Sequence, residues 1–273
     1  MPSKDTVGSK PEHGYVVDKD VFVPARDGVK LAVDVYRPDA PGKFPALLAI
    51  SPYGKDAQMF ETPPQPFGKS VFEASIESGN AYWYAERGYV YVMADLRGIG
   101  HSEGEYEGVF SHYEGEDGAD IVEWIAQQPW CDGNVGMAGI CYFGSMQLHV
   151  AACQPPHLKC IAPWEIYGDD LYNHGEYEGG VANIFWYGLY TGTYPARCGY
   201  APNNVVSAME KYAPKAELDR LLKEAMEDPD LRQYPYLYHN LLYPKKNPCL
   251  FDFLLNKLDG PWWKERSVAE RLD

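Results

Sequence analysis

The chain lacks the features that mark membrane, secreted or nucleic-acid-binding proteins. No stretch approaches the roughly 20 consecutive apolar residues that a membrane-spanning helix needs. Basic residues are too few to balance the acidic ones, and the formal net charge is −15. An acidic surface repels phosphate backbones, so we expect neither nucleic acid nor a membrane as a partner. Residues 1–14 are polar, without the apolar core of a signal peptide, and are predicted to form a flexible tail.

The sequence also lacks the cysteine and histidine spacings of metal sites. It contains no C-x-x-C pair and no H-x-x-x-H pair, so we expect no metal and no cofactor. Scattered thiols without a signal peptide favour a reducing compartment, which predicts a cytoplasmic location. Cys153 and Cys160 lie in apolar surroundings and are predicted to be core residues. The six cysteines are Cys131, Cys141, Cys153, Cys160, Cys198 and Cys249.

Apolar runs and helical patterns alternate along the first 168 residues. Two alternating segments joined by a turn at 25–28 predict a hairpin, and continuous apolar runs predict buried strands. Strands that alternate with helices indicate an α/β fold with a doubly wound, mostly parallel sheet. The expected strands are 16–23, 31–36, 44–51, 89–94, 134–140 and 158–164, and the expected helices are 73–87, 113–127 and 144–152.

The pattern changes near residue 169, where glycine, tyrosine and tryptophan become frequent. The clearest later element is a helix over residues 214–227. We therefore divide the chain into a tail (1–14), a core (15–168) and a helical cap (169–273). The cap is expected to cover the C-terminal edge of the sheet, where ligands bind in open α/β folds. Trp164, Tyr167 and Trp186 are candidates for an apolar substrate pocket, although such aromatics also serve as packing.

Cys141 lies where a predicted strand turns sharply into a predicted helix, in the sequence G-I-C-Y-F-G at residues 139–144. A nucleophile at such a turn, with glycines around it, is the nucleophile elbow of α/β-hydrolases. The thiolate of Cys141 would attack an ester, amide or thioester carbonyl. The N-terminus of the following helix is expected to lower the pKa of this thiol. The alternative is a buried cysteine at a tight turn.

Two further groups are predicted to hold the negative charge that develops in such an attack. The loop at residues 51–55, S-P-Y-G-K, directly follows the strand 44–51 and is placed to form half of an oxyanion hole. Tyr53 offers a hydroxyl there, and the backbone N–H of Tyr142, just after the nucleophile, forms the other half. Asp95 and Arg97, in the loop after the strand 89–94, are expected to fix that loop through a salt bridge.

Three sequence blocks carry a resemblance to a known family. They are S-P-Y-G-K (51–55), D-L-R-G-x-G-x-S-E-G (95–104) and Q-P-W-C-D-G-N-V-G-M-x-G-x-C-Y-x-G (128–144). The chain resembles the N-terminal part of the CocE/NonD α/β-hydrolases, which are related to cocaine esterase, α-amino-acid ester hydrolases and X-prolyl dipeptidyl peptidases. The family elbow is G-x-S-Y-x-G, which Gly144 matches. By this resemblance Tyr53 is the oxyanion tyrosine and Tyr142 is the backbone donor.

Two departures from that family shape the functional prediction. Cys141 stands in place of the family's serine. The family also places its catalytic aspartate and histidine on loops after the cap, whereas this chain ends where those strands would begin. His149 lies eight residues beyond Cys141 on one helix, about 12 Å along its axis, which is too far for a hydrogen bond. His101 is predicted to be a solvated loop residue. A partner polypeptide or a C-terminal segment is therefore expected to complete the sheet and the triad.

We predict an acyl hydrolase or acyltransferase that works through a Cys141 thioester on a small-molecule acyl substrate. Activity is expected only after the missing histidine and aspartate are supplied. The alternative is a non-catalytic, hydrolase-like scaffold or binding subunit that has lost its triad. Preferential alkylation of Cys141 would distinguish the two, since an activated thiol reacts faster than a structural one.

Overall fold

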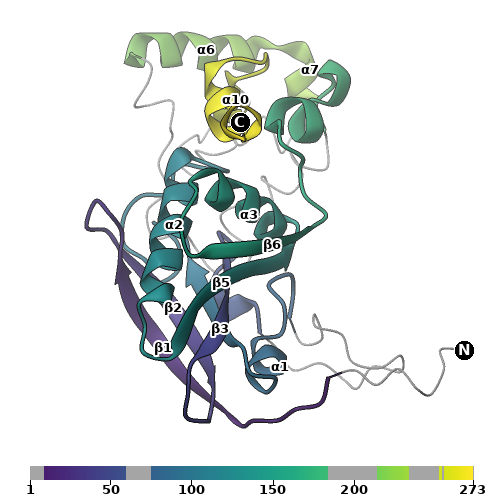
Figure 1. Ribbon diagram of the computed structural model, residues 1–273. Coiled ribbons are helices and arrows are strands. Elements are labelled where there is room, and N and C mark those ends of the chain that lie inside the picture. Colours follow the sequence, from purple (N-terminus) through teal and green to yellow (C-terminus); the bar gives the residue numbers. More distant parts are fainter. Residues whose placement is uncertain (1–8, 60–74, 184–213, 234–251, 254, 273) are drawn as a thin grey trace, which may run out of the picture.

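A mixed sheet organises the part of the chain that the computed structural model describes, namely residues 9–59, 75–183, 214–233, 252–253 and 255–272. Its strand order is β1-β2-β4-β3-β5-β6 (Figure 1). The strands are β1 (Tyr15–Pro24), β2 (Lys30–Pro38), β3 (Phe44–Ser51), β4 (Val90–Asp95), β5 (Cys131–Ile140) and β6 (Leu158–Trp164). All six predicted strands are present.

The pairing of these strands follows the sequence pattern. The alternating segments β1 and β2 form an antiparallel hairpin, and β2 pairs antiparallel with β4. The apolar runs β3, β4, β5 and β6 are parallel to one another. Every residue of β4 is buried, as expected for a central strand with both faces covered. The predicted mostly parallel sheet is thus confirmed, and the C-terminal ends of its parallel strands lie along one edge.

Two helices pack together beside the sheet, α2 (His112–Ala126) and α3 (Tyr142–Ala152) (Figure 1). Glycines on α2 allow the close approach. A Cβ on Gly118 would lie 2.3 Å from Val150 Cγ2, and one on Gly115 would lie 2.7 Å from the carbonyl oxygen of His149. The helix predicted over 113–127 is confirmed. The one predicted from residue 144 begins at Tyr142, directly after the candidate nucleophile.

The helix predicted over 73–87 is wrong for residues 75–80. Here the helix is α1 (Ala81–Ala85), and the preceding residues form a bridge and a bend. Gly79 has a φ of 96°, outside the helical region. The side chain of Asn80 accepts a hydrogen bond from Trp83 N at 2.9 Å and so caps the helix start. The Ser-Gly-Asn sequence at residues 78–80 therefore stops the helix from extending backwards.

Further helices and turns follow the sheet. They are a π-helical turn (Tyr172–Glu176), a 3₁₀ turn (Glu178–Gly180), α6 (Lys215–Glu227), α7 (Pro229–Arg232), α10 (Pro261–Arg266) and a last 3₁₀ turn (Ala269–Arg271). The predicted helix over 214–227 corresponds to α6. No helix in the described ranges is both long and apolar enough to span a membrane.

The segment around α10 contacts loops at the C-terminal ends of the parallel strands. Arg266 Nη2 donates to the carbonyl of Glu107, in the region between β4 and α2, at 3.2 Å. Val268 N donates to the carbonyl of Asp169, which follows β6, at 2.9 Å. The ring of Trp263, buried completely, packs against Tyr172 and other aromatics. These contacts hold the end of the chain against the edge where the predicted site lies.

Candidate active site

Cys141 occupies a strained turn between β5 and α3. Its φ is 58° and its ψ is −117°, a backbone conformation rare for a residue with a side chain. Its N–H donates to the carbonyl of Trp164 at the end of β6, at 2.9 Å, and its carbonyl accepts from Ser145 N at 2.9 Å. The turn is therefore held by the neighbouring strand and by the first turn of α3. This geometry is that of a nucleophile elbow.

The glycines of the elbow are required by close packing. A Cβ on Gly139 would lie 2.5 Å from Phe143 Cβ, and the φ of Gly139 is 152°. A Cβ on Gly144 would lie 2.5 Å from the carbonyl oxygen of Trp164. Larger residues at either position would push α3 away from the strands that orient Cys141.

Two hydroxyl groups and one backbone amide lie around the sulfur of Cys141. The hydroxyl of Tyr53 lies 3.9 Å from Sγ, and the hydroxyl of Tyr167 lies 3.7 Å from it. The backbone N–H of Tyr142 also donates toward the sulfur. The structure thus brings Cys141 together with the two predicted oxyanion residues and with Tyr167, a predicted substrate residue. Hydroxyl and amide donors beside the sulfur can stabilise an oxyanion formed on a carbonyl at this point.

The side chain of Tyr142 serves the core instead of the site. Its hydroxyl donates to Glu114 Oε2 at 2.6 Å and accepts from Phe110 N at 3.1 Å. Its ring stacks on that of Phe110, with 4.3 Å between centroids. Because the side chain is fixed between α2 and the preceding loop, only the amide of Tyr142 faces the nucleophile.

The thiol of Cys141 is less acidic than the sequence predicted. Burial raises its pKa, and the nearby charge of Glu77 raises it further. Hydrogen bonds from Tyr167, Tyr53 and the Tyr142 amide oppose this rise without overcoming it. The expectation that the helix N-terminus would give a low pKa is therefore wrong, because desolvation and a neighbouring carboxylate outweigh the helix dipole.

Glu77 is the site residue that sequence reasoning missed. Burial raises the pKa of its carboxyl group to about 7, although the neighbouring thiol of Cys141 acts to lower it. Its backbone carbonyl accepts from Ile140 N, one residue before the nucleophile, at 3.1 Å. No motif signalled this position, because Glu77 reaches the elbow through a backbone contact across more than 60 residues of sequence.

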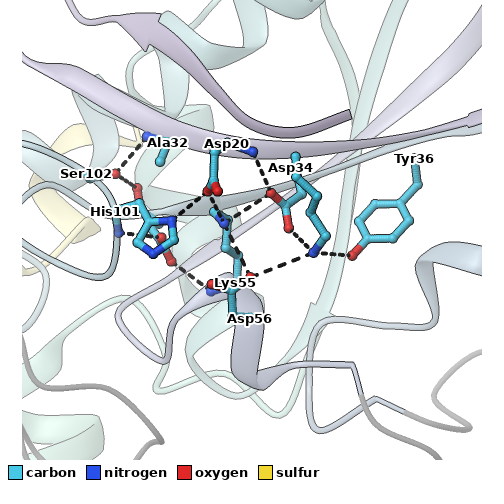
Figure 2. Close-up of polar contacts among 10 residues, drawn as sticks. Asp20, Ala32, Asp34, Tyr36, Lys55, Asp56, His101 and Ser102 are labelled. Atoms are coloured by element: carbon cyan, nitrogen blue, oxygen red, sulfur yellow. Dashed lines mark hydrogen bonds and ion pairs between the residues drawn. The ribbon is translucent and has the colours of Figure 1, made fainter. Parts of the chain in front are cut away.

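The loop that carries Tyr53 is anchored by a buried lysine (Figure 2). Lys55 Nζ lies 2.7 Å from Asp20 Oδ1 and 3.0 Å from Asp34 Oδ1, and the side chains of Lys55 and Asp34 are 0% exposed. These bonds keep the lysine charged and raise its pKa although burial alone would lower it. The loop is thereby tied to β1 and β2.

Asp95 and Arg97 do not form the predicted salt bridge. Asp95 accepts from the backbone N–H groups of Lys55 at 2.7 Å and His101 at 3.0 Å, and so joins two loops at the sheet edge. Arg97 pairs with Asp117 on α2, with its Nε donating to Oδ2 at 2.7 Å, and with Asp27. The prediction failed because the two side chains have different partners, Asp95 in the loop that carries Tyr53 and Arg97 on α2.

The described histidines contact groups other than Cys141. His149 is buried, stacks on Phe110 and accepts from Arg271 Nη2 at 3.1 Å. Burial and Arg271 lower the pKa of His149 to about 3, so it stays neutral. His101 is exposed and bonds to Asp20 at 2.6 Å. The others pair with Phe44 (His13), Glu265 (His112), Glu123 (His157) and Asp169 (His174), while His239 lies outside the described residues.

The remaining predicted positions differ in their surroundings. The side chain of Trp164 is 51% exposed, while its backbone carbonyl holds the elbow; a substrate contact for it stays a prediction. Trp186 lies outside the described residues. Cys153 is half-buried and packs against the core, while Cys160 is exposed on β6, so the expectation of a core position is wrong for Cys160. Within the described ranges, no group of three or more His, Cys, Asp or Glu residues could hold a metal ion.

Comparisons with known proteins agree with this geometry. The sequence pattern of the X-Pro dipeptidyl-peptidase family (S15 family) matches residues 27–273. A stretch of 169 residues is 43% identical to cocaine esterase of Rhodococcus sp. (strain MB1 Bresler) and covers 62% of this chain and 26% of that enzyme. The chain thus spans about a quarter of the length of this relative.

Solved structures show the same fold. A CocE/NonD family hydrolase from Staphylococcus aureus superposes with a TM-score of 0.58 at 32% identity, over 72% of this chain and 35% of that one. An α-amino acid ester hydrolase superposes with a TM-score of 0.60 at 19% identity, over 99% of this chain and 43% of that one. The predicted α/β-hydrolase fold and the CocE/NonD resemblance are confirmed. The chain belongs to the X-Pro dipeptidyl-peptidase (S15) family of α/β-hydrolases.

Proposed function

We propose that this chain carries the nucleophile and oxyanion groups of an acyl hydrolase or acyltransferase that works through a Cys141 thioester. The observation that carries the proposal is the arrangement at the elbow. Cys141 has a positive φ between β5 and α3, and the Tyr53 hydroxyl, the Tyr167 hydroxyl and the Tyr142 amide lie around its sulfur. Kinship with esterases and peptidases supports hydrolysis of an ester or amide as the general class of reaction.

The reaction begins with attack of Cys141 Sγ on the substrate carbonyl carbon. The carbonyl π electrons move to oxygen, and the Tyr53 hydroxyl and the Tyr142 amide donate to the resulting oxyanion. Collapse of the tetrahedral intermediate breaks the bond to the alcohol or amine leaving group, which takes up the proton that the Cys141 thiol gave up during the attack. The acyl group remains on sulfur as a thioester. Water then hydrolyses it, or an amine accepts the acyl group, to which thioesters are good donors.

The histidine and aspartate of the triad are proposed to come from a further segment or a partner polypeptide. None of the described histidines reaches Cys141, and the chain spans 26% of the length of cocaine esterase. In the described part of the sheet, β6 pairs with β5 on one side only. A strand added to that free edge would also bring its following loop to the edge of the sheet that holds Cys141.

A burst experiment tests the proposed function. We expect p-nitrophenyl acetate to release p-nitrophenolate in a burst of about one equivalent per chain, because acylation uses groups that the chain contains. The C141A variant should lose the burst. A burst of equal size in C141A would contradict the proposal and favour the non-catalytic scaffold.

A further inference from the structure

Glu77 is held beside the nucleophile by the backbone of the elbow strand. Its carbonyl accepts from Ile140 N at 3.1 Å, and its own N–H donates to Gln58 Oε1 at 3.3 Å. The neighbouring Ile76 N donates to the carbonyl of Gln58 at 3.1 Å, and Tyr91 OH donates to the carbonyl of Ser78. Two of these bonds tie residues 76–78 to β4 and β5, and the other two tie them to Gln58, so the position of Glu77 is built into the fold.

The carboxyl group of Glu77 has one oxygen without a protein partner. Its Oε2 is buried and makes no hydrogen bond within the described part of the chain. The carboxyl group lies close enough to the thiol of Cys141 for each group to shift the pKa of the other. A buried carboxyl group costs free energy unless it is paired, so its place beside a strained nucleophile needs an explanation.

We propose that Glu77 is the proton acceptor for the Cys141 thiol in the acylation step. This inference deepens the proposed function and rests on it. As Sγ forms its bond to the carbonyl carbon, the Sγ–H bond breaks and the proton moves to a carboxylate oxygen of Glu77. The substrate oxygen takes the electron pair, and the Glu77 carboxylic acid is left neutral. That acid can then give its proton to the departing alcohol or amine, which restores the carboxylate.

No other described group is better placed for this transfer. The hydroxyls of Tyr53 and Tyr167 also touch the sulfur, yet a neutral phenol is a poor base. His149 and His101 are bonded elsewhere. Glu165, an exposed residue after β6, acts on Glu77 only through its charge, which raises the pKa of that carboxyl. Glu77 is therefore the described carboxylate that interacts with the Cys141 thiol.

The two acids must titrate as a coupled pair. Two negative charges in contact repel, so the first proton is lost near the pKa of Glu77, about 7, and the second only at the raised pKa of Cys141. After the first loss the remaining proton is shared, and a fixed minor fraction of molecules carries it on Glu77 with a thiolate at Cys141. Between the two pKa values this thiolate fraction is the species that an alkylating agent modifies, and its size does not change with pH.

The pH dependence of Cys141 alkylation tests this pair without any substrate. We expect the rate of iodoacetamide labelling at Cys141, followed by peptide mass mapping of the whole chain, to rise toward about pH 7 and then flatten. It should rise again at alkaline pH. In E77Q the rate should instead increase about tenfold per pH unit from about pH 6 to 8, since only the thiol ionisation remains. The matched control E165Q removes a charge that raises the pKa of Glu77. Its labelling rate should therefore still flatten, but at a slightly lower pH.

The outcomes separate this inference from the proposed function. A wild-type rate that rises tenfold per pH unit without flattening overturns the role of Glu77, whether or not E77Q folds. A flattening that persists in folded E77Q also overturns it. Flattening that is lost in E77Q supports the pair even if the p-nitrophenolate burst fails. Conversely, a burst at Cys141 without flattening leaves the proposed function intact and rejects Glu77.

Discussion

At the scale of single residues, the site depends on backbone strain and on burial. Cys141 adopts its positive φ because β6 and α3 hold it from both sides. Burial keeps its thiol protonated near neutral pH, as the raised pKa indicates. A cysteine in this setting needs a proton acceptor during attack, unlike a cysteine already ionised. The surroundings of the sulfur therefore matter as much as the identity of the nucleophile.

The strain at the elbow predicts a stability effect. We expect Gly139→Ala to lower the free energy of unfolding by about 1–3 kcal/mol or more, because it combines a positive φ with a Cβ 2.5 Å from Phe143 Cβ. Gly133→Ala is the matched control. Gly133 also has a positive φ, of 90°, but no atom lies within 4 Å of its added Cβ. Urea denaturation of both variants measures the difference, and equal losses would contradict the close packing inferred at the elbow.

At the scale of elements, the oxyanion loop is positioned by ionic contacts with two strands. Lys55 is the central group, since it joins the loop to Asp20 on β1 and to Asp34 on β2. Asp95, at the end of β4, holds the backbone of the same loop. Tyr53 lies two residues before Lys55, so the ion pairs of Lys55 (Figure 2) hold the loop that carries its hydroxyl.

The buried lysine predicts a second stability effect. We expect Lys55→Met to destabilise the fold by about 3–5 kcal/mol, because it leaves the fully buried Asp34 without its buried cation. Lys19→Met is the control. Lys19 pairs with the same carboxylate but is half exposed, and its loss should cost about 1 kcal/mol or less. Urea denaturation at neutral pH gives both values. Equal costs would show that Lys55 does not anchor the loop.

Elements were predictable where a pattern in the sequence reports burial directly. The continuous apolar runs of β3 and β6 gave the same boundaries in the sequence and in the structure. The helix before β4 is shorter than the sequence predicts, because the residues before α1, including Ser78, Gly79 and Asn80, are not helical. Cys141, Tyr53 and Tyr142 came from motifs within short segments. Glu77 has no such signal, since only tertiary packing brings it to Ile140 and Cys141.

The failed electrostatic predictions share a physical cause. For Asp95 and Arg97, nearness in sequence suggested a pair, while the fold gives each a different partner. For Cys141, the helix N-terminus suggested an acidic thiol, while desolvation dominates. Both depend on the three-dimensional surroundings of a charge, which a sequence does not display.

At the scale of the whole molecule, the chain places Cys141 and the hydroxyl and amide groups around its sulfur at one edge of a hydrolase sheet. It spans about a quarter of cocaine esterase, and β6 ends the described sheet. We propose that acylation is encoded within this chain, while efficient release of the acyl group needs the histidine and aspartate supplied by a further segment or partner. The isolated chain should then stop as a stable acyl-enzyme after one turnover.

The location of the acyl group tests the central claim most directly. After reaction with p-nitrophenyl acetate, peptide mass mapping should find one acetyl group on Cys141, and neutral hydroxylamine should remove it, as expected for a thioester. The exposed thiol of Cys160 is the internal control and should remain largely unmodified. The account is contradicted if acetylation follows exposure, with Cys160 modified in preference to Cys141.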